Sequence, residues 1–321
     1  MGLTHVGHSE IRSFAVDKVN LPVEKASKYR EQAKGLQDRL QNYLDDHEDF
    51  SLRRMVLSGS LAKGTALKSL NDIDVGCYIT GVDESTDTTD LINFLVEKLG
   101  KAYPNFSQDQ ITPQTYCVTV SFKGSGLDVD IVPILYNGDP QWKGKLVSQR
   151  DGTLLDTSVP MHLQFIKKRK SEHKIHFAQV VRLVKFWIKQ RKLEDEDFRF
   201  KSFMAELILA KLADDGCDFT DYPEALQSFF SYVASSNLKE VIAFSDYYSI
   251  DRIPKCDDRV KVFDPVNSEN NAAKRYGFLE AQKIIDAAID AGDAIDAAMY
   301  ATTKEKTIYY WQKVFGPTFS A

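Results

Sequence analysis

One stretch, residues 57–79, constrains the fold of this chain more than any other. It reads LSGSLAKGTALKSLNDIDVGCYI. A short apolar segment is followed by Gly59 and Ser60, and Asp72 and Asp74 stand at the start of an apolar strand. Side chains of a strand alternate between its two faces, so both aspartates are expected on one face and the isoleucine between them in the core. The stretch therefore predicts a half-buried strand whose open face carries two carboxylates.

These residue types favour a site for a divalent metal and a triphosphate. Two carboxylates one strand repeat apart repel each other, and a cation removes that penalty. Mg²⁺ takes hard oxygen ligands, typically one or two protein carboxylates, and fills its other positions with water and substrate phosphate. Upstream, Gly59 and Ser60 carry few side-chain atoms, so backbone N–H groups and a hydroxyl can approach phosphate oxygens. An ordinary acidic turn is the alternative interpretation.

The same residues carry a resemblance to a known superfamily. Gly59-Ser60 followed by Asp72-Ile73-Asp74 resembles the signature of the DNA-polymerase-β-type nucleotidyltransferases. In detail, SGSLAKGTAL and NDIDV resemble the cGAS/DncV-like nucleotidyltransferases and their relatives, the 2′-5′-oligoadenylate synthetases. The resemblance implies an α+β fold: a polymerase-β-like nucleotidyltransferase core (mixed sheet with helices) plus a helical C-terminal domain, bridged by a long N-terminal helix. It also implies Mg²⁺, for which Mn²⁺ can substitute, as cofactor and ATP as substrate.

A third carboxylate is expected from the predicted strand at residues 127–135, LDVDIVPIL. Asp128 and Asp130 share one face of this strand, and the apolar residues between them share the other. A third acidic residue from a neighbouring strand is what a two-metal site needs to hold the ion that activates the attacking hydroxyl. In the resembling family this carboxylate comes just before an apolar, often proline-containing run. The role is therefore assigned to Asp130, which IVPI follows, with Asp128 as the fallback; the metal ligands are then Asp72, Asp74 and Asp130.

Three further residues match donor-nucleotide positions of the resembling family. In that family a lysine in one helix and a serine at the start of the next contact the donor triphosphate, and the aromatic residue after the serine stacks on a nucleobase. Lys185, Ser202 and Phe203 match these positions in VRLVKFW and FKSFMAELIL. A cation and a helix N-terminus both favour phosphate, and a ring face accepts a base. From the residues alone, Lys185 equally fits a lysine that extends along an apolar surface to water, and Ser202 an N-cap.

Periodicity divides the chain into three expected domains. Residues 1–50 read as two helices, the second with an apolar stripe at three- and four-residue steps, and the resemblance implies that they brace both lobes. Residues 51–155 read as mixed strands and helices and residues 156–321 as mostly helical. The resemblance implies that the first is the nucleotidyltransferase catalytic core and the second a helical, oligoadenylate-synthetase-like C-terminal domain. Within them, glycines and a proline predict a loop at residues 138–156.

Asp264-Pro265 followed by Asn270-Asn271 resembles a segment of the oligoadenylate-synthetase C-terminal domain. The same residues also fit a turn that caps a helix starting near Ala272.

Composition narrows the classes of function. A formal net charge of −5 argues against a protein that coats nucleic acid constitutively. The basic run at residues 167–170, with Lys174, predicts a solvated helix end, and contact with duplex DNA there is the alternative. The chain has no apolar run long enough for a membrane span and no signal-peptide core. Its four widely spaced cysteines predict reduced thiols and a cytoplasmic location.

Several longer segments narrow the resemblance. GLDVDIVPILY, FAQVVRLVKFW and AGDAIDAA are most similar to the bacterial cyclic-oligonucleotide synthases of CBASS antiphage operons, in the branch encoded beside HORMA-domain proteins. This implies a Mg²⁺-dependent enzyme that joins ATP into 3′,3′,3′-cyclic tri-AMP and is activated by a HORMA-domain partner from the same operon. The alternatives are a linear nucleotidyltransferase acting on RNA ends or a small molecule, and an inactive scaffold. The three retained carboxylates argue against the scaffold.

Overall fold

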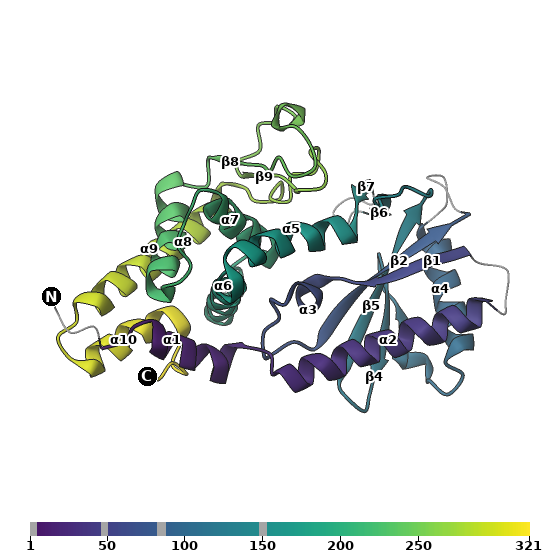
Figure 1. Ribbon diagram of the computed structural model, residues 1–321, viewed down its shortest axis with the longest axis horizontal. Coiled ribbons are helices and arrows are strands. Elements are labelled where there is room, and N and C mark those ends of the chain that lie inside the picture. The colour runs from purple at the N-terminus through teal and green to yellow at the C-terminus, as the bar shows by residue number, and fades with distance from the viewer. Residues whose placement is uncertain (1–4, 46–50, 82–87, 148–152) are drawn as a thin grey trace. The chain divides into compact units, whose positions relative to one another are not determined.

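The strands predicted around the two aspartate pairs are neighbours in one mixed sheet (Figure 1). The computed structural model describes residues 5–45, 51–81, 88–147 and 153–321. Within these residues the sheet has the order β1-β2-β5-β4-β3, with β6 added beside β5 and β7 beside β6. The central pair, β2 and β5, is parallel, and the other pairs are antiparallel. The strands are β1 (Ser51–Leu57), β2 (Asp72–Thr80), β3 (Ile111–Pro113), β4 (Val118–Phe122), β5 (Leu127–Tyr136), β6 (Gly144–Val147) and β7 (Leu154–Thr157).

Two helices, α2 (Val23–Asp45) and α4 (Thr88–Ala102), cover the apolar face of this sheet. Figure 1 shows α2, in purple, lying along the strands. The stripe predicted on α2 is buried against the alternate residues of the sheet: Ala26, Tyr29, Ala33, Leu36 and Leu40 from the helix, with Ile73, Val75, Val129 and Ile131 from β2 and β5. Because strand side chains alternate, the opposite face is left for the polar residues of the same strands.

The prediction of a loop at residues 138–156 is wrong, since this region contains β6 and β7. Gly144 pairs with Tyr136 of β5, and a Cβ atom at Gly144 would lie 2.6 Å from the Leu135 carbonyl oxygen. The glycine is therefore needed for close pairing of two strands, which is a role that sequence alone does not separate from a turn.

The C-terminal half is helical, as predicted, apart from a two-stranded parallel ribbon. Three short helical segments also occur among the described residues: π-helical Ala15–Val19 and 3₁₀-helical Gln108–Gln110 and Ile250–Arg252. The remaining elements are α1 (His8–Phe14), α3 (Gly59–Lys63), α5 (Val159–Glu172), α6 (Lys174–Glu194), α7 (Ser202–Asp214), α8 (Tyr222–Ser236), β8 (Val241–Ile242), β9 (Lys261–Val262), α9 (Phe278–Tyr300) and α10 (Lys304–Phe315).

The helix expected to start near Ala272 begins instead at Phe278. The Asn271 side chain holds the preceding residues in a turn: its Oδ1 accepts from the backbone N–H groups of Val262 and Ala273, each at 3.0 Å. Its Nδ2 donates to the Val260 carbonyl at 2.8 Å. These bonds tie the segment to β9, so the next helix starts only after Gly277.

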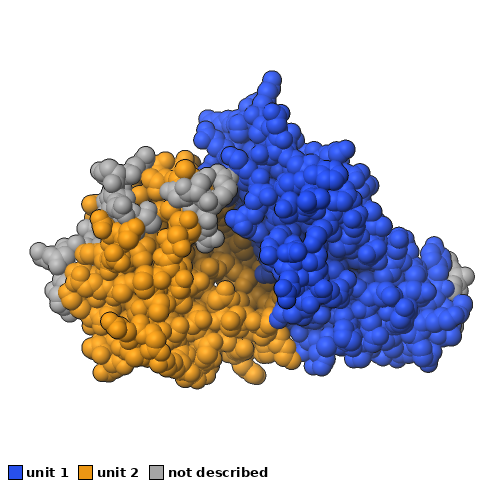
Figure 2. Space-filling model, turned by 180° about the vertical axis from the view of Figure 1, so that it is seen from behind, with its two compact units in different colours: residues 1–20, 165–321 blue, residues 21–164 orange. Residues whose placement is uncertain are grey.

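The chain separates into two compact units, coloured in Figure 2. One contains residues 21–164, including the sheet and α2, and the other contains residues 1–20 with residues 165–321. The breaks therefore fall at residues 20 and 164, whereas the sequence places them near 50 and 155. Among the described residues, none of the helices combines the length and the apolar character needed to cross a membrane.

Candidate active site

Four carboxylates lie on the polar face of the central parallel pair. Asp72 and Asp74 are exposed on β2 and alternate with buried residues, as predicted. The register places Asp72 beside Asp128 and Asp74 beside Asp130 on β5. The strand pairing thus brings together the three carboxylates assigned from the sequence, along with the fallback residue.

Gly59 and Asp74 are in close contact. Gly59 begins the short helix α3 (Gly59–Lys63) directly after β1, with a φ of 63°. A Cβ atom at this position would lie 2.0 Å from Oδ2 of Asp74, a separation that atoms cannot adopt. The preceding residue, Ser58, donates its backbone N–H to the Asp74 carbonyl at 2.7 Å. The glycine is therefore required so that the Asp74 carboxylate can lie against the backbone of the Gly59-Ser60 turn.

Two hydroxyls on β4, which the sequence reasoning missed, hold the carboxylates of β5. Thr119 Oγ1 donates to Asp130 Oδ1 and Ser121 Oγ donates to Asp128 Oδ1, each at 2.6 Å. The alternation in YCVTVSF is the signal that could have found them, since it places residues 117, 119 and 121 on one face.

The pKa of Asp130 lies above its ordinary value. Burial raises it most, the hydrogen bond from Thr119 lowers it, and the charges of Asp72 and Asp128 raise it further. Close by, burial together with the charges of Asp130 and Asp74 raises the pKa of the Cys117 thiol to about 11. Negative charge therefore accumulates on this face, which is the condition that a bound cation relieves.

The donor set fits Mg²⁺. Among the described residues, no three His, Cys, Asp or Glu side chains are grouped as a complete protein-only metal site would be. Mg²⁺ does not need such a group, because it usually binds one or two protein carboxylates and takes the rest of its ligands from phosphate and water. Asp72, Asp74 and Asp130 are all oxygen donors on one sheet face, and they would hold the ion together with a substrate triphosphate.

The donor-nucleotide residues assigned from the sequence lie in the helical unit, which is the compact unit of residues 1–20 and 165–321, whereas the carboxylates lie in the sheet unit of residues 21–164. Lys185 is half-buried on α6, and Ser202 and Phe203, also half-buried, are the first two residues of α7. The prediction that Ser202 is the N-cap of this helix is wrong, because Lys201 occupies the cap position and Ser202 is the first helical residue. Since these residues and the carboxylates belong to different compact units, their joint action remains a prediction.

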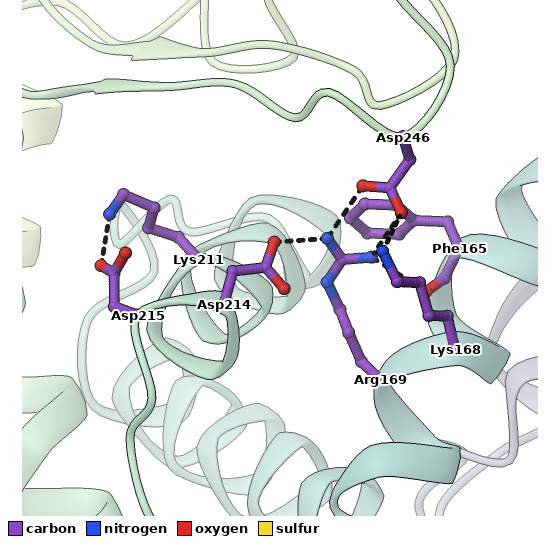
Figure 3. Close-up of polar contacts among 7 residues, drawn as sticks. All are labelled: Phe165, Lys168, Arg169, Lys211, Asp214, Asp215 and Asp246. Atoms are coloured by element: carbon purple, nitrogen blue, oxygen red, sulfur yellow. Dashed lines mark hydrogen bonds and ion pairs between the residues drawn. The ribbon is translucent and has the colours of Figure 1, made fainter.

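The basic run at residues 167–170 is not a uniformly solvated helix end. Arg169 is buried, and its guanidinium forms ion pairs with Asp214 at the end of α7 and Asp246 after β8 (Figure 3). It also lies 3.7 Å from the ring centroid of Phe165. Lys168 adds a 3.2 Å ion pair to Asp246. Arg169 is thus engaged inside the helical unit and is not available to nucleic-acid phosphates.

Comparison with known proteins places this geometry in a family. The Second Messenger Oligonucleotide or Dinucleotide Synthetase domain (SMODS) matches residues 7–168. The chain is 60% identical over 319 residues to the cyclic AMP-AMP-AMP synthase of Escherichia coli strain MS 115-1, covering 99% of both proteins. It is 31% identical over 317 residues to the CBASS oligonucleotide cyclase CdnC of E. coli strain KTE188, covering 97% of both.

Solved structures agree with the sequence comparison. The structure of E. coli MS115-1 CdnC with ATP superimposes with a TM-score of 0.94 at 60% identity, over 99% of this chain and 100% of that one. The complex of the same CdnC with HORMA-deltaN gives a TM-score of 0.93 at 59% identity, over 99% of each chain. Fold and sequence therefore agree over almost the whole length.

Proposed function

Because the chain belongs to the family of second-messenger oligonucleotide or dinucleotide synthetases, it is a nucleotidyltransferase that makes a cyclic oligonucleotide, and we propose that it joins ATP into cyclic AMP-AMP-AMP. The observation that carries the proposal is the nearly full-length similarity to an E. coli synthase of this product. ATP is the proposed substrate because the similar CdnC has been solved with ATP. The links are proposed to be 3′-5′, and the setting to be CBASS antiphage defence.

The proposed chemistry uses three carboxylates on the polar face of the sheet. Asp72 and Asp74 on β2 and Asp130 on β5 would hold Mg²⁺. The ion would neutralise charge on the triphosphate and activate the attacking hydroxyl. Gly59 allows Asp74 to lie against the turn backbone, where N–H groups of the Gly59-Ser60 turn bind phosphate oxygens.

The helical unit is proposed to bind the donor nucleotide. Lys185 would neutralise part of the triphosphate charge, and Ser202 at the start of α7 would bind a phosphate oxygen. Phe203 offers a ring face on which a base can stack. Each role rests on a motif match, and each can be removed by a single substitution.

We also propose that a HORMA-domain protein binds this chain and activates it. The support is the solved complex of the similar CdnC with HORMA-deltaN. A partner can raise activity only by binding the competent arrangement of the enzyme better than the resting one. Duplex DNA is a further proposed activator, although the burial of Arg169 removes one of the cations on which a contact at residues 167–174 would depend.

The experiment that tests the proposed function follows the fate of α-labelled ATP. The purified chain is incubated with labelled ATP and Mg²⁺, with and without the other three nucleotides, and the products are treated with phosphatase. A cyclic product resists phosphatase because it has no terminal phosphate. We expect a labelled product from ATP alone whose mass phosphatase leaves unchanged. A labelled product that loses terminal phosphates to phosphatase, and so falls in mass while its internal links keep their label, would favour the linear nucleotidyltransferase instead.

A further inference from the structure

Strand β4 places a row of hydroxyl groups beside the carboxylates of β5. The antiparallel register sets Thr119 directly opposite Asp130 and Ser121 directly opposite Asp128. Side chains directly opposite in such a pair have Cβ atoms about 5 Å apart, within reach of a hydrogen bond. In both pairs that bond is formed, at 2.6 Å, from hydroxyl to carboxylate.

The hydroxyl of Thr119 has a defined direction. A carboxylate only accepts hydrogen bonds when ionised, so the hydroxyl proton of Thr119 points to Asp130 Oδ1. Threonine is branched at Cβ, which restricts rotation about χ1. The acceptor-only carboxylate and the restricted χ1 together hold one donor, the Thr119 hydroxyl, on one oxygen of Asp130.

The other oxygen of Asp130 is left for substrate-side contacts. Among the described residues, Thr119 supplies the one hydrogen bond to this carboxylate, and it uses Oδ1. Repulsion from Asp72 and Asp128 would otherwise turn the carboxylate away from its neighbours, because like charges so near to each other are costly. A charge-assisted bond from a rigid donor opposes that rotation.

We propose that Thr119 is a positioning residue of the synthase, whose hydroxyl fixes the orientation of the Asp130 carboxylate for metal binding and hydroxyl activation. This inference rests on the proposed function, because it requires Asp130 to act with Asp72 and Asp74. It adds a residue on a third strand, β4, to a site built from β2 and β5.

The chain contains a matched control. Ser121 makes a bond of the same type and length to Asp128, one strand repeat away on the same face. Removal of either hydroxyl disturbs the same strand and the same sheet face. Only the removal of the Thr119 hydroxyl frees the carboxylate that the proposed reaction uses.

The test compares Thr119→Val, Thr119→Ser and Ser121→Ala in the full chain with its HORMA-domain partner. Valine keeps the shape of threonine without the hydroxyl, and serine keeps the hydroxyl. The measurements are kcat and KM for ATP, the melting temperature, and Mn²⁺ affinity by isothermal titration in the presence of a non-hydrolysable ATP analogue. Loss of a residue that orients a metal-binding carboxylate typically costs about 10- to 100-fold in affinity or activity.

We expect Thr119→Val to lower kcat and Mn²⁺ affinity in that range, with KM for ATP and the melting temperature close to the wild-type values. Thr119→Ser should restore most of both losses, and Ser121→Ala should keep both quantities near wild type. An unchanged kcat and Mn²⁺ affinity in Thr119→Val would overturn the inference, as would an equal loss in Ser121→Ala, which would transfer the role to Asp128. If the wild-type chain makes no product, the proposed function fails, and the Mn²⁺ titration still decides the role of Thr119.

Discussion

At the scale of single residues, the site depends on the contact between Gly59 and Asp74. Alanine at position 59 would force its Cβ against Oδ2 of Asp74, so the carboxylate must move. A displacement of about 1 Å at a reacting group can cost about 100-fold in rate. We therefore expect Gly59→Ala to lose at least about 100-fold in initial rate of ATP consumption.

Gly126 provides the control for backbone strain. It has the same φ of 63° as Gly59, but a Cβ atom there would have no neighbour within 4 Å. Gly126→Ala therefore carries the strain without the collision and should keep nearly full activity. Similar losses of activity in both variants would show that backbone strain, and not the displacement of Asp74, is responsible.

The donor assignment makes a separate prediction for Lys185. If its ammonium binds the triphosphate, Lys185→Ala should weaken ATP binding by about 10-fold or more, the usual cost of a hydrogen bond to a charged group. Ser202→Ala should weaken it less, and Lys189→Ala, one turn further along α6, should have little effect. Calorimetric titration with a non-hydrolysable ATP analogue measures all three. An unchanged affinity for the ATP analogue in Lys185→Ala would favour the alternative interpretation, in which the Lys185 side chain extends along an apolar surface to water and does not bind the triphosphate.

Much of the carboxylate face could be predicted because strand periodicity is visible in sequence. Asp72, Asp74 and Asp130 alternate with apolar residues, and the structure places them on one face. The bond between Thr119 and Asp130 could not be predicted, since it depends on the register of β4 against β5, which no local pattern specifies.

At the scale of elements, buried helices and strands were predictable and short irregular pieces were not. The apolar stripe of α2 and the alternation in β4 and β5 are consequences of burying one side, so they appear in the sequence. In contrast, the four-residue strands β6 and β7 are too short for a period to be recognised. The basic run in α5 shows a similar limit, because consecutive helical residues point in different directions and Arg169 is the one that faces inward.

Arg169 joins three segments of the helical unit, and its removal is expected to be costly. Arg169→Met would leave Asp214 without its cation and Asp246 with Lys168 alone, and removal of one partner of a buried ion pair typically destabilises a protein by about 3–5 kcal/mol. The exposed pair of Lys211 and Asp215, nearby in Figure 3, is the control, and Lys211→Met should cost no more than about 1 kcal/mol. Urea unfolding measures both. Equal, small losses would mean that Arg169 is not an essential anchor.

The same cluster predicts a dependence of stability on pH. Burial raises the pKa of Asp246, but hydrogen bonds and charge from Arg169 and Lys168 outweigh it, and the net pKa is lowered from 3.8. A lowered carboxyl pKa gives stability that is present above the unfolded value and lost as pH falls through the folded one. The free-energy difference between wild type and Asp246→Asn should therefore be constant at neutral pH and shrink below about pH 4. If the free-energy difference between wild type and Asp246→Asn grew as the pH fell, the lowered pKa of Asp246 would be contradicted.

At the scale of the whole molecule, long-range bonds decide which segments belong together. Asn20 lies next to α2 in the sequence, yet its side chain pairs with Gln179 and Arg182 of α6 at 2.9 Å. The first twenty residues therefore belong to the helical unit, whereas α2 belongs to the sheet unit. No composition change marks this break, which is why the domain limits expected from the sequence lie elsewhere.

Regulation by a partner is a prediction about the whole molecule. We expect the purified chain to be slow by itself and faster with its HORMA-domain partner, because a partner that prefers the competent state shifts the population toward it. Initial rates with the chain alone, with the partner, and with the partner plus duplex DNA measure this effect. Full-speed synthesis by the isolated chain would contradict the regulation and leave the catalytic proposal intact.

We propose above that the carboxylate face of β2 and β5 makes cyclic AMP-AMP-AMP from ATP. The most direct measurement is the mass and phosphatase resistance of the product formed by the wild-type chain and by Asp72→Asn with Asp74→Asn, each with its HORMA-domain partner. We expect a resistant cyclic trimer of AMP from wild type, and none from a double variant that keeps the wild-type melting temperature, because the triphosphate charge is then left uncompensated. Cyclic product from the folded double variant, or a wild-type product that loses terminal phosphates to phosphatase, would contradict this prediction.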